Sequence, residues 1–185
     1  MNTLALQRLS HILAQGGVVA YPTEAVFGIG CDPDCTPAVQ RLLQLKHRPW
    51  HKGMILIAAE LAQLEPYILP LSRAQRARIG TSWPGPHTWV VPARPSVSPW
   101  LRGAHRTLAV RVTAHPLAAA LCRHYGKPLV STSANSAGSP PCRSAQQVRW
   151  RLGRELDALL YGATGGLAKP TTIHDLASGA ILRSA

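Results

Sequence analysis

The sequence predicts an α/β fold built on a mixed sheet. Short apolar runs typical of strands alternate along the chain with longer runs whose apolar residues recur at the helical period of about 3.6 residues. Apolar residues make up 46% of the 185, which is enough to bury a core without disulfides or metals. No repeat, heptad pattern or low-complexity tract divides the chain. We therefore expect a single domain over residues 1–185.

The first part of the chain contains two predicted helices with a strand between them. Residues 4–13 carry leucines on one helical face, and the glycine pair at 16–17 closes this helix before a strand at 18–21. The Thr-Pro pair at 36–37 combines a capping residue with a first-turn proline. This pair predicts a second helix that ends near residue 46.

The rest of the chain continues the alternation. Residues 54–58 form an apolar run typical of a strand buried on both faces, and an Arg-rich helical pattern follows at 72–79. Next come a strand at 88–91, a loop or lid at 92–106 rich in Pro, Ser, Arg and Gly, and a strand at 108–112. The last predicted elements are a helix at 115–125, a strand at 128–132, a helix with a capping box of Ser144 and Gln147, and short strands near 157–161, 171–176 and 180–183.

The charge balance indicates an anionic partner. Lys and Arg number 20 against 8 Asp and Glu, for a formal net charge of +12, and 16 of the 20 cations are Arg. Guanidinium groups match the geometry of phosphate and stack on bases, so phosphate or nucleic acid is the expected partner. Solubility alone is the alternative explanation of the excess charge.

Cysteine usage and hydropathy bear on location. Cys31, Cys35, Cys122 and Cys142 are too few and too scattered for a disulfide framework, so we expect reduced thiols in the cytoplasm. Because Cys31 and Cys35 lack a second pair at metal-ligand spacing, we expect no metal site on the protein. No apolar run approaches the roughly 18 residues that a membrane span requires, so a soluble protein without a membrane partner is expected.

The most charged short segment is residues 46–53, which we call the cation loop. Lys46, Arg48 and Lys52 lie within seven residues that contain no carboxylate, and Pro49 prevents a continuous helix through them. The chain has no G-x-x-x-x-G-K-[ST] phosphate loop and no complete dinucleotide glycine motif. If a nucleotide binds, another cradle must hold its phosphates, and the cation loop is the candidate.

Polar groups at the ends of strands form a second set of candidates. Thr23 follows the first strand and offers a hydroxyl and an amide to a small ligand, although a plain turn explains it equally well. Thr88 opens a strand after a rigid Pro-Gly-Pro turn, with the same alternative. Ser131, Ser133 and Asn135 lie at the carboxyl end of a predicted central strand, where ligands of open α/β sheets bind. Capping of the next turn is the alternative explanation of these three.

Arg111 is a charge inside an apolar strand and therefore needs a partner. One alternative is an ion pair with a scarce carboxylate, such as Glu24 or Asp175. The other is a bidentate contact to the carboxylate of a ligand. The scarcity of acids in the chain favours the ligand.

Six motifs occur in one order along the chain. They are Tyr21-Pro22-Thr23-Glu24-Ala25-Val26-Phe27-Gly28, Lys46-x-Arg48 with Lys52-Gly53, Pro84-Gly85-Pro86-x-Thr88, Val110-Arg111-Val112, Ser131-Thr132-Ser133-Ala134-Asn135 and Pro170-Thr171-Thr172-Ile173. From about residue 16 to residue 183 the chain resembles the YrdC/Sua5 family of threonylcarbamoyl-AMP synthases, most closely its short, single-domain bacterial form. Each motif alone is loose, whereas six in family order are specific.

The resemblance implies an open, twisted α/β sheet with a basic concave cleft. It also implies a nucleotidyltransferase that forms L-threonylcarbamoyladenylate and pyrophosphate from L-threonine, bicarbonate and ATP, for threonylcarbamoyladenosine modification of tRNA. Mg²⁺ carried by ATP is the expected cofactor. A tRNA or a tRNA-modifying protein complex is the expected partner.

The resemblance further implies roles for individual residues. These are contacts to L-threonine at Thr23, Arg111 and Ser131; catalytic contacts to the triphosphate and the carbamate at Lys46, Arg48 and Lys52; and contacts to the nucleotide at Thr88, Ser133, Asn135 and Arg143.

Two other functions are compatible with the sequence. A non-catalytic RNA-binding module of the same fold would explain the charge and the Arg excess but not the hydroxyl cluster. A carbamoyltransferase of the same broad fold would act on another acceptor, although such proteins usually carry additional domains.

Overall fold

The protein is built from short helices and strands that alternate along the chain. The structure, a computed structural model, describes residues 3–136 and 138–184. Its helices are α1 (Thr3–Ala14), α2 (Thr36–Leu45), α3 (Arg73–Gly80), α4 (Pro99–Arg102), α5 (Pro116–Tyr125) and α6 (Ala145–Leu152), with 3-10 helices η1 (Trp50–Lys52) and η2 (Leu61–Leu64). Its strands are β1 (Val19–Pro22), β2 (Phe27–Gly30), β3 (Ile55–Ala58), β4 (His87–Pro92), β5 (Thr107–Val112), β6 (Leu129–Ser133), β7 (Ala158–Leu159), β8 (Thr172–Asp175) and β9 (Ile181–Arg183).

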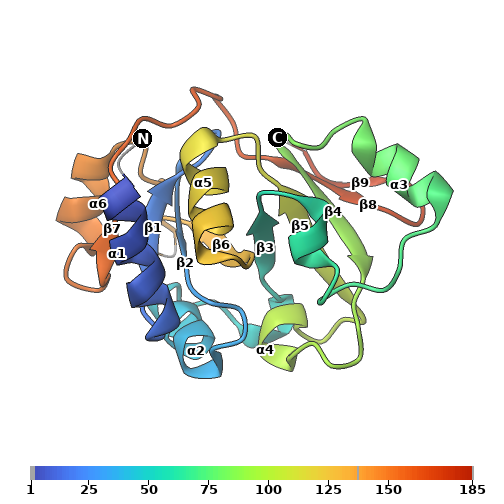
Figure 1. Cartoon of the computed structure of the whole chain (residues 1–185), viewed down its shortest axis with the longest axis horizontal. Coiled ribbons are helices and arrows are strands. Elements are labelled where there is room, and N and C mark those ends of the chain that lie inside the picture. The colour runs from blue at the N-terminus through green and yellow to red at the C-terminus, as the bar shows by residue number, and fades with distance from the viewer. Residues whose placement is uncertain (1–2, 137, 185) are drawn as a thin grey trace.

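The strands of the described residues form one nine-stranded sheet in the order β7-β1-β2-β6-β3-β5-β4-β8-β9 (Figure 1). The pairs β1–β7, β3–β5 and β4–β8 are parallel, and the other pairs are antiparallel. The sheet is mixed and open, with β7 and β9 at its edges. This confirms the predicted fold class.

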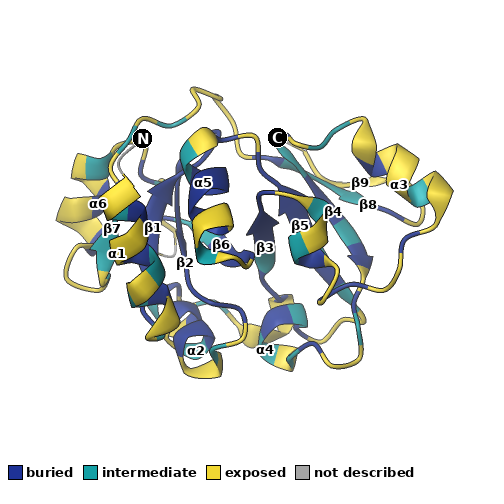
Figure 2. Ribbon diagram, viewed as in Figure 1, coloured by how far each residue is buried: buried dark blue, intermediate teal, exposed yellow. Residues whose placement is uncertain are grey.

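Side chains alternate between the two faces of the central strands, and one face packs under α1 and α5. There Leu13 of α1 and Leu121 of α5 meet Tyr21, Ile57 and Leu129 of the sheet, all of them fully buried. Figure 2 shows the central strands β1, β2, β3 and β6 as largely buried and the outer surfaces of these helices as exposed. The two helices cover part of this face and leave the part toward β5, β4 and β8 for the cavity described below.

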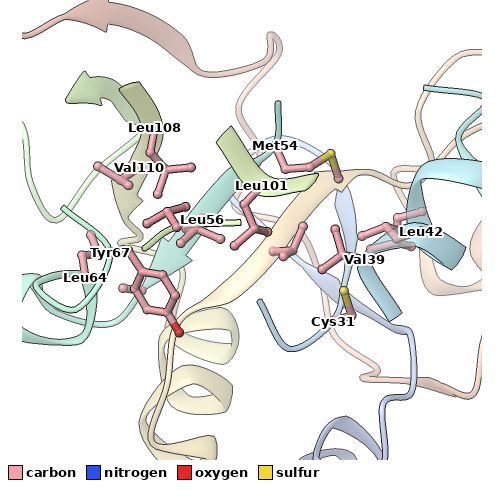
Figure 3. Packing of buried hydrophobic residues seen from close by; sticks show 14 of the residues in the cluster. Cys31, Val39, Leu42, Met54, Leu56, Leu64, Tyr67, Leu101, Leu108 and Val110 are labelled. Atoms are coloured by element: carbon pink, nitrogen blue, oxygen red, sulfur yellow. The ribbon is translucent and has the colours of Figure 1, made fainter. Parts of the chain in front are cut away.

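The opposite face packs against α2 and α4. Leu56 and Val110 of the sheet lie in one cluster with Leu42 of α2 and Leu101 of α4 (Figure 3). Because Leu56 faces this cluster and Ile57 faces the other, β3 is buried on both sides, as its continuous apolar run predicted.

Strand β2 was not predicted, because its Phe-Gly-Ile-Gly sequence is typical of a turn. The glycines are required by close packing of the chain. A Cβ on Gly30 would lie 1.9 Å from the Val130 carbonyl oxygen, so only glycine allows β2 to pass this point of the core.

Three local predictions were wrong in part. Helix α2 begins at Thr36 with Cys35 as its N-cap and no side-chain cap, so the predicted cap is displaced by one residue. The segment at 92–106 is not a free loop, since it contains α4 and buries Val97 and Leu101. The capping box of α6 is half formed: Ser144 accepts from the Gln147 amide, while the Gln147 side chain accepts from the Arg143 amide.

Candidate active site

A cavity of about 670 Å³ opens beside β5, β6 and β8. Such a volume suits a small-molecule ligand. Its lining contains five cations, Arg48, Lys52, Arg102, Arg111 and Arg183, and none of its described lining residues is Asp or Glu. Walls that carry one sign of charge raise the local concentration of the opposite ion. The cavity is therefore suited to an anion.

Lys46 lies just behind this wall. It is the C-terminal cap of α2 and is only 9% exposed. Its Nζ donates to the Ser133 carbonyl at 2.8 Å, to the Asn135 carbonyl at 2.5 Å and to Asn135 Oδ1 at 2.6 Å. Burial, and after it the nearby charge of Arg48, lowers the pKa of Lys46 to about 8. Protein oxygens thus occupy all three N–H groups, and Lys46 ties the cation loop to the end of β6.

Arg48 and Lys52 lie in the wall itself. Arg48 Nε donates to the Gly53 carbonyl at 2.9 Å, and this bond fixes the guanidinium against the cation loop. Burial, and after it the charge of Arg183, lowers the pKa of Arg48. Lys52 is exposed at the end of η1. The cation loop therefore faces the same cavity as Thr23 and Ser133, which lie far from it in the sequence.

Thr23 occupies the turn between β1 and β2. Its Oγ1 donates to the Val26 carbonyl at 2.6 Å, and its amide donates to the same carbonyl at 3.1 Å. Thr23 as a residue is 6% exposed and lines the cavity. With its proton used inside the turn, the oxygen can only accept from a ligand, for instance from an ammonium group.

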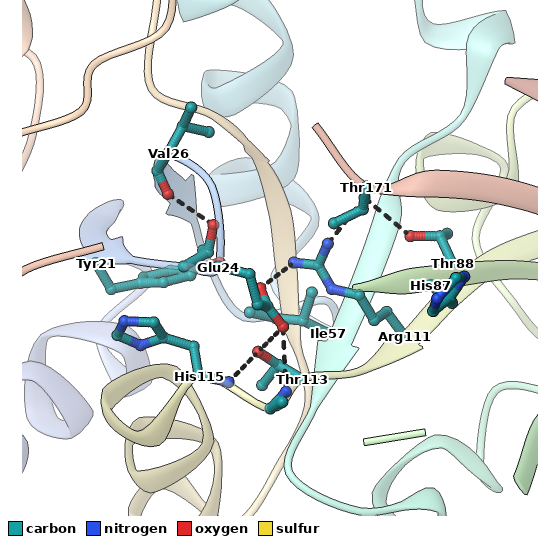
Figure 4. A network of polar contacts seen from close by, with 12 residues as sticks. Tyr21, Glu24, Val26, Ile57, His87, Thr88, Arg111, Thr113, His115 and Thr171 are labelled. Atoms are coloured by element: carbon teal, nitrogen blue, oxygen red, sulfur yellow. Dashed lines mark hydrogen bonds and ion pairs between the residues drawn. The ribbon is translucent and has the colours of Figure 1, made fainter. Parts of the chain in front are cut away.

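Arg111 has the first of the two partners that the sequence left open, a carboxylate of the chain. Its Nη2 lies 3.5 Å from Glu24 Oε2, and its Nη1 donates to Thr171 Oγ1 at 3.0 Å (Figure 4). Glu24 is itself held by the Thr113 hydroxyl at 2.7 Å. Arg111 is therefore an ion-pair partner, and it also lines the cavity. A role in binding a ligand carboxylate stays a prediction.

Arg111 and Glu24 each keep one buried polar atom without a hydrogen-bond partner in the described residues, Nε of Arg111 and Oε2 of Glu24. Unsatisfied buried groups are costly. A ligand oxygen that reached the Arg111 Nε–H would offset part of this cost.

Ser131, Ser133 and Asn135 follow one another through the end of β6. Ser131 and Ser133 line the cavity. Ser133 Oγ donates to Asn135 Oδ1 at 2.7 Å, and Asn135 Nδ2 donates to the Ser139 carbonyl at 2.6 Å. Asn135 is not part of the cavity wall, but it links Ser133 to Lys46.

The structure places the two remaining candidates outside the wall. Thr88 is fully buried, and its Oγ1 lies 3.5 Å from Thr171 Oγ1, so any effect on a ligand passes through Thr171. Arg143 is exposed and donates to the carbonyls of Leu167 at 3.3 Å and Ala168 at 2.5 Å. It holds the segment that leads to Thr171.

Comparison with known proteins agrees with this geometry. A family profile of Sua5, YciO and YrdC proteins, described as "Telomere recombination", matches residues 11–185. The chain belongs to this Sua5/YciO/YrdC family. A family member from Nitrosococcus oceani, named threonylcarbamoyl-AMP synthase, is 56% identical over 174 residues, which cover 94% of each chain. Another of that name, from Stenotrophomonas maltophilia, is 53% identical over 186 residues and the full length of both chains.

The fold of the family is shared with a protein of known structure. The crystal structure of P. abyssi Sua5 complexed with L-threonine matches with a TM-score of 0.89 at 29% sequence identity, over 96% of this chain and 53% of that chain. The present chain thus spans about half the length of that Sua5 chain. The predicted membership of the family is confirmed.

Several cavity residues had no role in the sequence-based prediction. They are Arg102, His105, Thr107, Thr171 and Arg183. Thr171 lies in one of the six motifs that carried the family resemblance, so a signal for it was present. Arg183 follows a three-residue apolar run at 180–182, and nothing in its local sequence indicates that it returns to the site.

Proposed function

We infer that this protein is a threonylcarbamoyl-AMP synthase, a nucleotidyltransferase that acts on ATP, L-threonine and bicarbonate. The observation that carries this inference is the identity above 50% over nearly the whole length of proteins with that name. The cation-lined cavity agrees with it, because both the triphosphate and the carbamate of threonine are anions.

The reaction needs two anions held together and does not need a side-chain nucleophile. The neutral amine of threonine adds to carbon dioxide derived from bicarbonate and, after losing a proton, forms a carbamate. A carbamate oxygen then attacks the α-phosphorus of ATP, a new P–O bond forms, and the bond to the leaving pyrophosphate breaks. Two unit charges about 4 Å apart interact by about 4 kcal/mol at an effective dielectric near 20. Cations that offset this repulsion are the main catalytic requirement.

We assign the residues to two sides of the cavity. Thr23, Arg111 and Ser131 bind L-threonine, with the Thr23 oxygen accepting from the ammonium or amine group. Arg48 and Lys52 contact the triphosphate and the carbamate directly, and Lys46 holds Ser133 and Asn135 in position for the nucleotide. Arg143 and Thr88 act indirectly, by positioning the segment that carries Thr171. The assignment is supported by the common position of Thr23, Arg48, Lys52, Arg111, Ser131 and Ser133 in the lining of one cavity.

ATP enters as its Mg²⁺ complex. Among the described residues no cluster of three or more His, Cys, Asp or Glu side chains could hold a metal ion, and the described lining of the cavity has no carboxylate. The ion is therefore held by ATP oxygens and water, so that it arrives as part of the substrate.

The product is reactive, and its use implies an acceptor. We propose a tRNA or a tRNA-modifying protein complex as that acceptor, in the cytoplasm, with the 185 residues acting as one domain. The formal charge of +12 supports a polyanionic partner. None of the described helices is long and apolar enough to cross a membrane.

The proposed function is tested by pyrophosphate release with and without L-threonine and bicarbonate. Lys52→Ala and Arg48→Ala should each lower threonine-dependent release by more than about tenfold, since each removes one charge next to the reacting anions. Lys127→Ala is the matched control, because Lys127 pairs with Asp32 and Asp34 away from the cavity. Normal turnover by both folded site variants would contradict the assignment. Salt-sensitive RNA binding without any ATP consumption would favour the RNA-binding module instead.

A further inference from the structure

One wall of the cavity is built from the edge of the sheet. Strand β8 pairs with β4, and β9, which is exposed throughout, pairs with β8. Thr171, directly before β8, accepts from Arg111 and approaches Thr88 (Figure 4). Arg183, at the end of β9, donates through Nη2 to the Thr171 carbonyl at 2.9 Å. The position of β8 therefore fixes both Thr171 and Arg183 in the cavity wall.

The other face of the same edge carries two imidazoles in contact. Val90 and Ile173 line the cavity, so Trp89 and His174, one residue away along each strand, point to the opposite face. There His87 Nδ1 lies 3.1 Å from His174 Nε2. This side-chain bond joins β4 to β8 directly behind the wall of the site.

Ring contacts anchor the imidazole pair. His174 stacks on Trp89, with ring centroids 4.7 Å apart and planes inclined by 26°. Trp89 Nε1 donates to Ser82 Oγ at 2.9 Å, and Trp83 Nε1 donates to the His87 carbonyl at 2.7 Å. The segment after α3 thus fixes the β4 side of the pair, while His174 is the member carried by the edge strand.

The bond between the imidazoles depends on their protonation. It needs one N–H and one lone pair, so it forms in a neutral or singly protonated pair and is lost when both rings are protonated. Two like charges at this distance also repel each other. Burial, and after it the neighbouring His87, lowers the pKa of His174.

Charged side chains of the adjoining elements are already engaged. Arg78 of α3, Asp175 of β8 and Arg183 of β9 each have another hydrogen-bond partner. Within the described residues none of them bonds to either imidazole. Burial and the neighbouring ring, and none of these three charges, are the causes of the lowered pKa of His174.

We propose that His87 and His174 form a latch that positions Thr171 and Arg183 for substrate, and that a second proton on the pair releases β8. The assignment of a ligand to this wall rests on the proposed function. A histidine whose folded pKa is lowered binds its proton more tightly in the released state. The latch is therefore closed at neutral pH and above, and it weakens as the pH falls below the usual histidine range near about 6.5.

Two variants separate the latch from a merely structural role. His174→Gln keeps an amide that can bond to His87 but cannot titrate. His174→Phe keeps a ring against Trp89 but loses the bond. His124→Gln, at an exposed position of α5, is the matched control.

The first measurement is the Kd of L-threonine by calorimetry from about pH 7.5 to about pH 5.5. In the wild type and in His124→Gln the Kd should rise at least about fivefold over this range, and in His174→Gln it should change less than about twofold. His174→Phe should bind threonine more weakly than the wild type already at the upper pH. Equal pH dependence in the wild type and His174→Gln would overturn the proposal.

The second measurement does not depend on the proposed function. Amide hydrogen exchange at residues 172–175 should accelerate at low pH, relative to residues 129–133 of the central strand, in the wild type but not in His174→Gln. Failure of threonine to bind at any pH would count against the proposed function alone, and exchange would then decide the latch. If residues 172–175 show the same pH dependence of relative exchange in the wild type and in His174→Gln, the latch is overturned.

Discussion

Lys46 shows how one side chain joins two parts of the site. Its ammonium group is shared among three oxygens of Ser133 and Asn135. A neutral amine has two N–H groups and no charge, so at least one of these bonds fails on deprotonation. Because burial lowers the pKa of Lys46 to about 8, this change falls within a range where binding can be measured.

Nucleotide affinity should therefore weaken as the pH rises through about 8. Below this pH Lys46 is protonated and holds the end of β6; above it the charge and one bond are lost. We expect the Kd of a non-hydrolysable ATP analogue to rise about tenfold between about pH 7.5 and about pH 9.5, measured by calorimetry. Lys46→Met should bind weakly with little pH dependence in this window. A flat profile for the wild type would show that the charge on Lys46 does not support the site.

At the scale of elements, the cation loop depends on a close contact with the segment around α4. Gly53 has φ of 64°, a conformation that L side chains rarely adopt, and a Cβ there would lie 2.9 Å from the Arg102 carbonyl oxygen. The Met54 amide donates to the Leu101 carbonyl at 2.7 Å just beyond it. The loop and α4 thus form one wall of the cavity.

Gly53→Ala should damage both stability and activity. Backbone strain and the contact with Arg102 should lower the free energy of unfolding by about 1–3 kcal/mol, seen in urea denaturation. Displacement of Arg48 and Lys52 should lower pyrophosphate release by about tenfold or more. Gly126→Ala is the matched control: its φ is 80° but no atom lies within 4 Å of the added Cβ, so it should lose stability and keep activity. Equal activity in the two variants would show that the close contact between Gly53 and the Arg102 carbonyl is not needed for activity.

The helices and the long apolar strands could be predicted because their signals are local. The period of apolar residues and the glycines after α1 each lie within a few residues of the boundary that they mark. Strand β2 could not, since Gly30 is required by the Val130 carbonyl on β6, a hundred residues away in the sequence. Tertiary packing overrides local propensity wherever a distant part of the chain limits the room for a side chain.

At the scale of the whole molecule, the order of the strands in the sheet brings the site residues together. This order cannot be read from the local sequence. Thr23, Arg48, Arg111 and Ser133 were candidates from local patterns, and the sheet brings them to one cavity. Arg183 reaches the same cavity only because β9 pairs with β8 at the edge. Its role depends on tertiary pairing, so only the structure reveals it.

The distribution of charge over the molecule leads to a last prediction. No Asp or Glu occurs between Glu65 and Glu155, a stretch that contains β4, β5 and β6. The cavity therefore combines its own five cations with a surrounding surface poor in acids. Such a field attracts a highly charged anion strongly and a zwitterion weakly, and added salt screens it.

The affinity for ATP should consequently depend on ionic strength far more than the affinity for L-threonine. Raising the salt from about 0.05 M to about 0.5 M shortens the screening length to less than half, and we expect the Kd of the ATP analogue to rise at least about tenfold. The Kd of the zwitterion should change less than about twofold, which makes it an internal control within one protein. Arg102→Gln removes one cation from the wall, so it should reduce the salt dependence for ATP. If ATP and threonine respond equally to salt, contacts other than the cations of the cavity hold the triphosphate, and the electrostatic account of this site fails.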